Sequence, residues 1–306
     1  MEEELISIVI TTYNRSNKLE DAIKSAFYQT YKNIEVIVVD DNSEIQNERE
    51  KTKEIVRKYN NINLILNSTN LGGALSRNEG IKASKGKLIS FLDDDDIYLP
   101  ERLKRMYEEY LKHKEENVGL IYCNCSRIND KKEIIGSYEH SYNGLPLYQQ
   151  MLGCIAGTSM WLAKKDVLES VSMFEDTPSK QDSILLLKII ANGYKVYSVN
   201  QNLVLYYEHN GNGISGVKLS NIKGLLNYRN WCRKFYDNLS NKRMINNVEC
   251  NFSRQLITLY IINDMRREAN NELKNIIRRK PISGVMLKST YKIWFSKNYL
   301  RKLGVK

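Results

Sequence analysis

The first hundred residues alternate short apolar runs with segments of helical periodicity. The apolar runs cover residues 5–12, 34–39, 62–66 and 87–92, and the helical patterns cover residues 18–29, 47–58 and 73–83. Strands that alternate with helices favour an α/β fold with a mainly parallel sheet. In such a sheet ligands bind beyond the carboxyl ends of the strands. The polar residues that follow the apolar runs are therefore the first candidates for a functional site.

Polar groups follow three of these runs, at residues 11–14, 40–43 and 93–96. The last group is four consecutive aspartates, whose mutual repulsion favours neutralisation by a cation. Ligand sets made only of oxygen favour a hard ion such as Mg²⁺ or Mn²⁺, which keeps positions for water and substrate phosphates. An acidic loop that caps the following helix is the alternative. The sequence contains neither a G-x-G-x-x-G nor a G-x-x-x-x-G-K-[ST] motif, so it predicts neither a dinucleotide fingerprint nor a P-loop.

The remainder of the chain mixes strands with helices and then becomes mostly helical. We expect strands at 119–125, 133–138, 158–163, 196–200 and 203–208, a helix at 182–192, and helices after about Leu219. A length of 306 residues without a Pro/Gly/Ser-rich linker predicts either one large domain with an appendage or two domains. We place the boundary near Gly216.

Positive charge is concentrated in the C-terminal part. Residues 218–306 contain 20 Lys or Arg and 5 Asp or Glu, whereas the first 217 residues carry a net charge of −5. A basic region on an acidic body suggests contact with a polyanion. No nucleic-acid-binding motif occurs and the acidic part would repel nucleic acid, so none is expected as a partner.

Aromatic residues accompany the cations near the C-terminus, among them Trp294 and Phe295 close to Lys297 and Arg301. This mixture suggests an interfacial amphipathic segment that contacts an anionic membrane. Packing on the body of the protein and an oligomer interface are the alternatives. No apolar run approaches the roughly 20 residues that span a bilayer, and the N-terminus lacks a basic signal-peptide region. We therefore expect a cytoplasmic protein, in peripheral contact with the inner face of the cell membrane.

Four segments resemble, in order and spacing, the motifs of family 2 glycosyltransferases: residues 6–14, 37–43, 72–78 and 91–96. The resemblance covers about residues 4–215. It implies a GT-A fold, with a mainly parallel, Rossmann-like nucleotide-binding sheet in residues 1–100 and an acceptor half in residues 101–216. A basic, mainly helical region, residues 217–306, lies outside the resemblance.

The resemblance also implies an activity. The family transfers a sugar with inversion, here from a UDP-sugar to a hydroxyl of a glycan or polyprenyl-linked acceptor, with Mn²⁺ or Mg²⁺ as cofactor. Hexosyl or N-acetylhexosaminyl transfer in cell-surface polysaccharide or capsule synthesis would fit this pattern.

The motifs assign residues to the nucleotide. Asp41 would accept a hydrogen bond from the N3–H of uracil, and the backbone around Thr11 and Tyr13 would hold the rest of the base. Arg77 would approach the nucleotide from the third helix, with Asn78 beside it, because a planar guanidinium suits phosphate. The alternatives are a turn residue for Asp41 and an exposed helix charge for Arg77.

The aspartate cluster overlays the D-x-D element of the family. Asp93 and Asp94 would lie near the ribose or sugar, and Asp95 would bind the metal that bridges the diphosphate. Four carboxylates in a row leave a shift of one residue open. His209 falls where many relatives place a metal or diphosphate ligand, although Glu208 stands where they often have arginine.

The catalytic base implied by the resemblance is Asp182, which would deprotonate the acceptor hydroxyl. Gln181 replaces the glutamate that usually precedes this aspartate. The alternative is that Asp182 only caps its helix.

Two other functions remain as alternatives. A nucleotidyltransferase usually holds triphosphate on a Gly-rich basic loop after the first strand, but residues 11–16 contain no glycine. A non-enzymatic polyanion-binding protein would rest on the basic C-terminal region alone.

Overall fold

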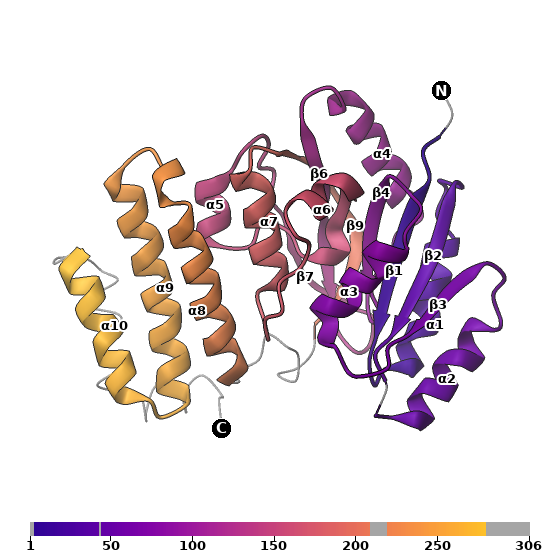
Figure 1. Cartoon of the computed structure of the whole chain (residues 1–306), viewed down its shortest axis with the longest axis horizontal. Coiled ribbons are helices and arrows are strands. Elements are labelled where there is room, and N and C mark those ends of the chain that lie inside the picture. Colours follow the sequence, from indigo (N-terminus) through magenta and orange to yellow (C-terminus); the bar gives the residue numbers. More distant parts are fainter. Residues whose placement is uncertain (1–2, 43, 209–218, 280–306) are drawn as a thin grey trace. The chain divides into compact units, whose positions relative to one another are not determined.

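The computed structural model describes residues 3–42, 44–208 and 219–279 (Figure 1). Its contacts divide the chain into two compact units. The first unit consists of Met1–Pro146, Cys154–Asp176 and Gln181–His209, and the second of Leu147–Gly153, Thr177–Lys180 and Asn210–Lys306. The boundary predicted near Gly216 lies outside the described residues.

The first unit is built on one sheet with the strand order β3-β2-β1-β4-β8-β6-β9-β5. Strand β1 (Ile6–Thr12) lies between β2 (Ile34–Asp40) and β4 (Leu88–Asp93) and is parallel to both. Strand β3 (Ile62–Leu66) is parallel to β2. The α/β fold with a parallel sheet that was predicted for the first hundred residues is confirmed.

Helices on both faces explain why β1, β2 and β4 are buried over most of their length. Connections between parallel strands are right-handed. The chain leaves β1 towards β2 and β3 but returns past β1 to β4, so α1 (Ser16–Phe27) and α2 (Gln46–Val56) cover one face and α3 (Gly72–Ala83) the other. Helix α3 approaches β1 closely, because a Cβ atom added at Gly80 would lie 2.3 Å from Cγ1 of Val9.

The other half of the sheet is mixed. Strand β8 (Trp161–Lys164) runs antiparallel to β4 and to β6 (Val118–Ile128). Strand β9 (Lys195–Tyr207) is parallel to β6, while the short β5 (Ile97–Tyr98) and β7 (Ile134–Tyr138) are antiparallel to β9 and β6.

Two features of this half differ from the sequence analysis. The strands expected at 196–200 and 203–208 are one continuous strand, β9, and the prediction of a break was wrong. Polar residues 200–202 lie at its centre, where the register with β6 shifts without interrupting the pairing. Helix α4 (Arg102–His113) was not predicted, although its buried residues Leu103, Met106 and Tyr110 recur at helical spacing.

Short helices complete the first unit between these strands. They are the 3₁₀ turn η1 (Thr158–Met160), α6 (Lys165–Ser170) and α7 (Gln181–Ala191). Helix α7 begins within one residue of the start predicted from the sequence.

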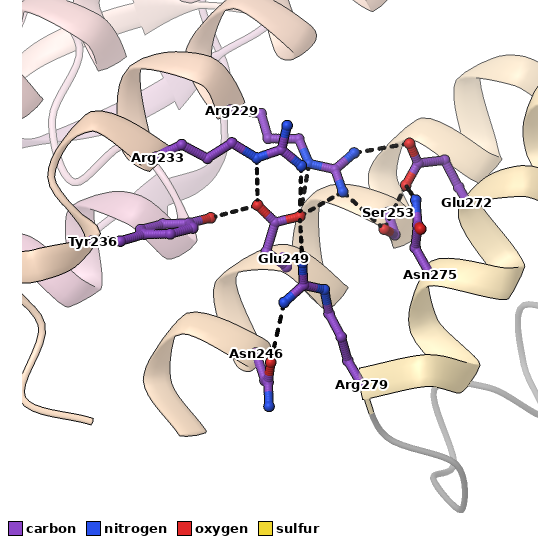
Figure 2. Close-up of polar contacts among 9 residues, drawn as sticks. All are labelled: Arg229, Arg233, Tyr236, Asn246, Glu249, Ser253, Glu272, Asn275 and Arg279. Atoms are coloured by element: carbon purple, nitrogen blue, oxygen red, sulfur yellow. Dashed lines mark hydrogen bonds and ion pairs between the residues drawn. The ribbon is translucent and has the colours of Figure 1, made fainter. Parts of the chain in front are cut away.

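The second unit is helical in its described part. It contains α5 (Leu147–Leu152), α8 (Leu219–Lys234), α9 (Lys242–Ile262) and α10 (Arg266–Arg279), with the 3₁₀ turn η2 (Tyr236–Asn238) after α8. A small apolar core of Cys250, Ile257 and Ile276 joins α9 to α10. Beside it lies a buried network of arginine and glutamate side chains from three helices (Figure 2). Within residues 3–42, 44–208 and 219–279, no helix has the length and apolar character to cross a membrane.

Candidate active site

The carboxyl ends of β1, β2 and β4 lie side by side at one edge of the sheet. In the strand register Thr11 is opposite Asp93, and Thr12 is opposite Asp40. The three polar groups that follow these strands in the sequence therefore meet in space, as their positions predicted.

Asp41 is buried and organises the start of α3. Its Oδ1 accepts hydrogen bonds from the Leu71 amide and from Nδ2 of Asn67, and its Oδ2 accepts one from the Gly72 amide, each at 2.8 Å. A carboxylate at a helix N-terminus is stabilised by the helix dipole. An ionised carboxylate has about four acceptor positions, so these three donors leave capacity for one more, such as an imide N–H.

The chain turns sharply after β1. Asn14 adopts a left-handed backbone conformation (φ +54°), which asparagine tolerates better than most residues, and its amide donates to Oδ1 of Asn42 at 2.6 Å. Tyr13, just before the turn, is 42% exposed, and Thr11 is half-buried. The turn leads directly into α1 and brings the next residue, Arg15, to the aspartate cluster.

Arg77 links the end of β4 to the start of α7. Its guanidinium donates to Oδ1 of Asp93 at 2.5 Å and to Oε1 of Gln181 at 3.2 Å, and it lies 5.7 Å from the ring centroid of Phe174. Asn78, the next residue, exchanges two hydrogen bonds with the backbone of Phe174. Asn78 thus ties α3 to the segment before α7.

Asp182 stands in the first turn of α7, next to the residue that Arg77 holds. Its Oδ1 accepts hydrogen bonds from the amide and the hydroxyl of Ser183. Its Oδ2 lies 4.0 Å from the position that a Cβ atom on Gly157 would take. The side chain is half-buried. The candidate base and the aspartate cluster are therefore connected through Arg77, although Asp182 lies 86 positions after Asp96 in the sequence.

The centre of the aspartate cluster is neutralised by one arginine. Arg15 contacts Oδ1 of Asp94 at 2.7 Å with one guanidinium nitrogen and Oδ2 of Asp95 at 2.6 Å with the other. Asp94 is fully buried, and burial raises the pKa of its carboxyl to about 7, with Arg15 opposing and the neighbouring Asp95 adding to that rise. Without Arg15, the ionised cluster would be still less favourable.

Asp96 points to the end of β9. Its Oδ1 accepts a hydrogen bond from the Tyr207 amide at 3.0 Å, and burial raises the pKa of its carboxyl. Lys18 lies over the Tyr207 ring, 3.0 Å from the centroid. A pocket at this place is lined by Lys18, Asp21, Asp95, Asp96, Ile97, Ile128, Asp130, Lys132 and Tyr207. His209, the predicted metal or diphosphate ligand, lies outside the described residues.

The donor set suits a hard divalent cation. Asp95 offers carboxylate oxygen at the edge of the sheet, and Oδ2 of the buried Asp94 has no hydrogen-bond partner within the described chain. Among residues 3–42, 44–208 and 219–279, no group of three or more His, Cys, Asp and Glu side chains is arranged to hold a metal. Mg²⁺ commonly takes only one or two carboxylates and completes its shell with water and substrate phosphates. The residues present therefore fit a metal that binds together with a diphosphate.

Sequence reasoning missed two contributors to this site. Arg15 follows the first motif directly, and a cation at the edge that carries four aspartates was the signal that could have identified it. Ser159 accepts a hydrogen bond from the Asp93 amide through its hydroxyl, and no sequence pattern marked it.

Comparisons with known proteins agree with the motifs. The profile of the family described as "Glycosyl transferase family 2" matches residues 7–171, which is more than half of the chain. An uncharacterized glycosyltransferase of Methanocaldococcus jannaschii is 30% identical over 210 residues, covering 67% of this chain and 71% of that protein.

A second relative has a more specific name. It is an Escherichia coli protein named UDP-Glc:alpha-D-GlcNAc-diphosphoundecaprenol beta-1,3-glucosyltransferase, 33% identical over 159 residues, which cover 51% of this chain and 60% of that enzyme. The matches to two Rickettsia glycosyltransferases span only 27% and 38% of those proteins.

Among solved structures, residues 1–349 of S. aureus TarS superpose with a TM-score of 0.56 at 17% identity, covering 91% of this chain and 92% of that one. The same protein has been solved with UDP-GlcNAc. The similarity shows that the two chains share a fold, and the predicted GT-A fold is confirmed.

Proposed function

Because the chain belongs to glycosyltransferase family 2, we propose that it transfers a sugar from a UDP-sugar to a hydroxyl of a glycan or lipid-linked acceptor, with inversion at the anomeric carbon. The observation that carries this proposal is the bridge of Arg77 between Asp93 and Gln181. This bridge supports the proposal because Arg77 contacts both Asp93, which would serve the donor, and Gln181, which precedes the proposed base Asp182.

The residues divide the reaction between them. Asp41 receives the N3–H of uracil, Thr11 and Tyr13 flank the base, and Arg77 faces the diphosphate from α3. Oδ1 of Asp182 holds both hydrogen bonds from Ser183, and Oδ2 takes the proton of the acceptor hydroxyl. The acceptor oxygen then forms a bond to the anomeric carbon while the bond to the UDP oxygen breaks, so one displacement inverts the centre.

Metal dependence is part of the proposal. Asp95 would hold Mn²⁺ or Mg²⁺, with Asp94 beside it, and the bound ion would supply Lewis-acid neutralisation of the leaving diphosphate. General-base help by Asp182 is typically worth about 10²–10⁴-fold.

Two relatives support the choice of substrates. The E. coli relative is named for a UDP-glucose donor and a GlcNAc-diphosphoundecaprenol acceptor, and TarS has been solved with UDP and with UDP-GlcNAc. A hexose or N-acetylhexosamine donor and a polyprenyl-linked acceptor of surface polysaccharide or capsule synthesis are the corresponding proposals here.

Release of UDP from a panel of UDP-sugars tests the function directly. We expect slow hydrolysis of one donor with Mn²⁺ or Mg²⁺ and its loss with chelator. Asp182→Asn should lower transfer to acceptor by about 10²-fold or more while leaving the calorimetric affinity for UDP unchanged. If the protein neither binds UDP nor releases it from any donor, the nucleotide site is refuted. Retention of the anomeric configuration would refute the single displacement.

Membrane contact is proposed separately for the second unit. Helix α10 carries Arg266, Arg267, Lys274, Arg278 and Arg279 against Glu268 and Glu272. Each cation near an anionic surface is worth about 1 kcal/mol, so this helix and the basic residues 280–306 would hold the enzyme at the inner leaflet. The protein should float with phosphatidylglycerol vesicles at low salt and not with phosphatidylcholine vesicles. Equal behaviour with both would remove the membrane proposal and leave the transferase proposal intact.

A further inference from the structure

Arg15 lies on the carboxylate to which the proposed function gives the metal. One guanidinium nitrogen is 2.6 Å from Oδ2 of Asp95 and the other is 2.7 Å from Oδ1 of Asp94. A guanidinium that spans two carboxylates is held more firmly than one with a single contact, because its planar donors have a fixed geometry. The Arg15 side chain remains 36% exposed, so it has a route into solvent.

Two other arginines near the strand ends pair with other carboxylates. Arg77 holds Asp93 at 2.5 Å, and Arg49 holds Asp40 at 3.3 Å. Asp95 is thus paired with Arg15 in the described structure, and a cation that binds this carboxylate meets the Arg15 charge.

A divalent ion and a guanidinium cannot occupy Asp95 on equal terms. Both are positive, and both would bind the same carboxylate at close range. Repulsion between a unit charge and a double charge a few ångströms apart is large even at the effective dielectric of a protein surface. Oδ2 of Asp94 has no hydrogen-bond partner within the described residues, so this carboxylate has spare acceptor capacity when the pairs rearrange.

We propose that Arg15 is the resident counter-ion of Asp95, which a divalent cation must displace in order to bind. Arg15 stabilises the aspartate cluster in the metal-free protein. It thereby lowers the affinity of the cluster for a divalent metal. This inference rests on the metal dependence proposed above. It assigns Arg15 a positioning role, since the residue acts through the carboxylates.

Titration of Mn²⁺ alone into the full chain tests the inference, with free Mn²⁺ followed by electron paramagnetic resonance. We expect Arg15→Gln to bind Mn²⁺ at least about tenfold more tightly than the wild type, because a unit charge close to a divalent ion costs more than that factor. Arg49→Gln is the matched control, with the same change of charge at a neighbouring strand end, and should bind like the wild type. Asp95→Asn should lose the site in either background.

The outcomes separate this inference from the proposed function. Equal or weaker Mn²⁺ binding by Arg15→Gln would overturn the role of Arg15 while the metal site stands. No Mn²⁺ binding by the wild type or by Arg15→Gln, either alone or in the presence of UDP, would overturn the metal dependence together with the inference. If Arg15→Gln does not fold by circular dichroism, Arg15→Lys replaces it: this variant keeps the charge but cannot span both carboxylates, and should bind Mn²⁺ more tightly than the wild type.

Discussion

Replacement of Glu249 by glutamine should destabilise the helical unit through its buried charges. Glu249 is 1% exposed and lies on α9. It accepts hydrogen bonds from Arg229 at 2.6 Å, from Arg233 at 2.7 Å and from the Tyr236 hydroxyl at 2.8 Å (Figure 2). Arg279, at the end of α10, approaches the same carboxylate at 3.7 Å.

The magnitude follows from what the substitution leaves behind. Glu249→Gln removes one negative charge and replaces one carboxylate oxygen by an NH₂ group, which cannot accept hydrogen bonds from the guanidinium donors. Removal of one partner from a buried ion pair costs about 3–5 kcal/mol. Arg229 is only 4% exposed but keeps Glu272 at 2.8 Å, and Arg233 is 45% exposed and can reach water. We therefore expect the low end of the range, about 3 kcal/mol.

The assay must report on this unit alone, because two compact units need not unfold together. Native-state amide hydrogen exchange over α8, α9 and α10 supplies the local opening free energy. Asp237→Asn is the matched control, since it removes one carboxylate charge from an exposed position of the same unit, and it should change that free energy by less than about 0.5 kcal/mol.

The pH dependence supplies an independent check. Burial alone would raise the pKa of Glu249, but the hydrogen bonds from Arg233 and Arg229 outweigh it and lower the pKa from 4.5 to about 2. A depressed pKa means that the native state binds fewer protons, so the stabilisation is fully present above pH 4.5 and is lost as the pH falls towards 2. The difference in local opening free energy between the wild type and Glu249→Gln should therefore shrink as the pH falls from 4.5 towards 2. A difference below about 1 kcal/mol at pH 7 would refute the reasoning and show that the network's attraction only offsets its desolvation.

Three further substitutions have defined outcomes. Gly80→Ala should lower the unfolding free energy of the first unit by about 1–3 kcal/mol, because its Cβ would lie 2.3 Å from Val9, whereas Gly157→Ala, in the same unit, meets its nearest atom at 3.7 Å and should change it little in the same thermal unfolding assay. Arg102→Met should cost about 3 kcal/mol in urea unfolding, because this fully buried guanidinium donates to one hydroxyl and two backbone carbonyls and its loss leaves these buried acceptors short of a donor; an unchanged midpoint would contradict this. Gln181→Glu should weaken UDP binding, measured by calorimetry, severalfold, because the new carboxylate would draw Arg77 towards α7. An unaltered affinity would show that Arg77 does not face the diphosphate.

The sequence predicts the nucleotide half of the fold well because its signals there are local. Apolar runs of strand length, separated by helical patterns, are sufficient to place β1, β2, β3 and β4 in a parallel sheet. The carboxyl ends of parallel strands share one edge, so the meeting of Thr11, Asp41 and Asp93 follows from the topology.

The acceptor half is harder to predict because its order depends on contacts between distant segments. The polar centre of β9 is tolerated because the strand pairs with β6 through a shifted register. Arg77 contacts both Asp93 and Gln181, although Arg77 and Gln181 lie more than a hundred positions apart in the sequence. No periodicity in the sequence predicts these contacts. The contact of Arg15 with the aspartates could not be predicted for a related reason. It depends on the turn at Asn14, which brings Arg15 next to these carboxylates.

The neutral side chain of Gln181 determines how strongly Arg77 is held at α7. A glutamate at position 181 would place Arg77 between two carboxylates, and both would form ion pairs with its guanidinium. Gln181 instead supplies only a neutral acceptor at 3.2 Å, so Asp93 at 2.5 Å is the one carboxylate that the structure records on this guanidinium within the described residues. A hydrogen bond to a neutral amide is weaker than one to a carboxylate, so the bond to α7 yields before the bond to β4. We therefore expect an arriving diphosphate to exchange with Gln181 and to leave the pair of Arg77 and Asp93 in place.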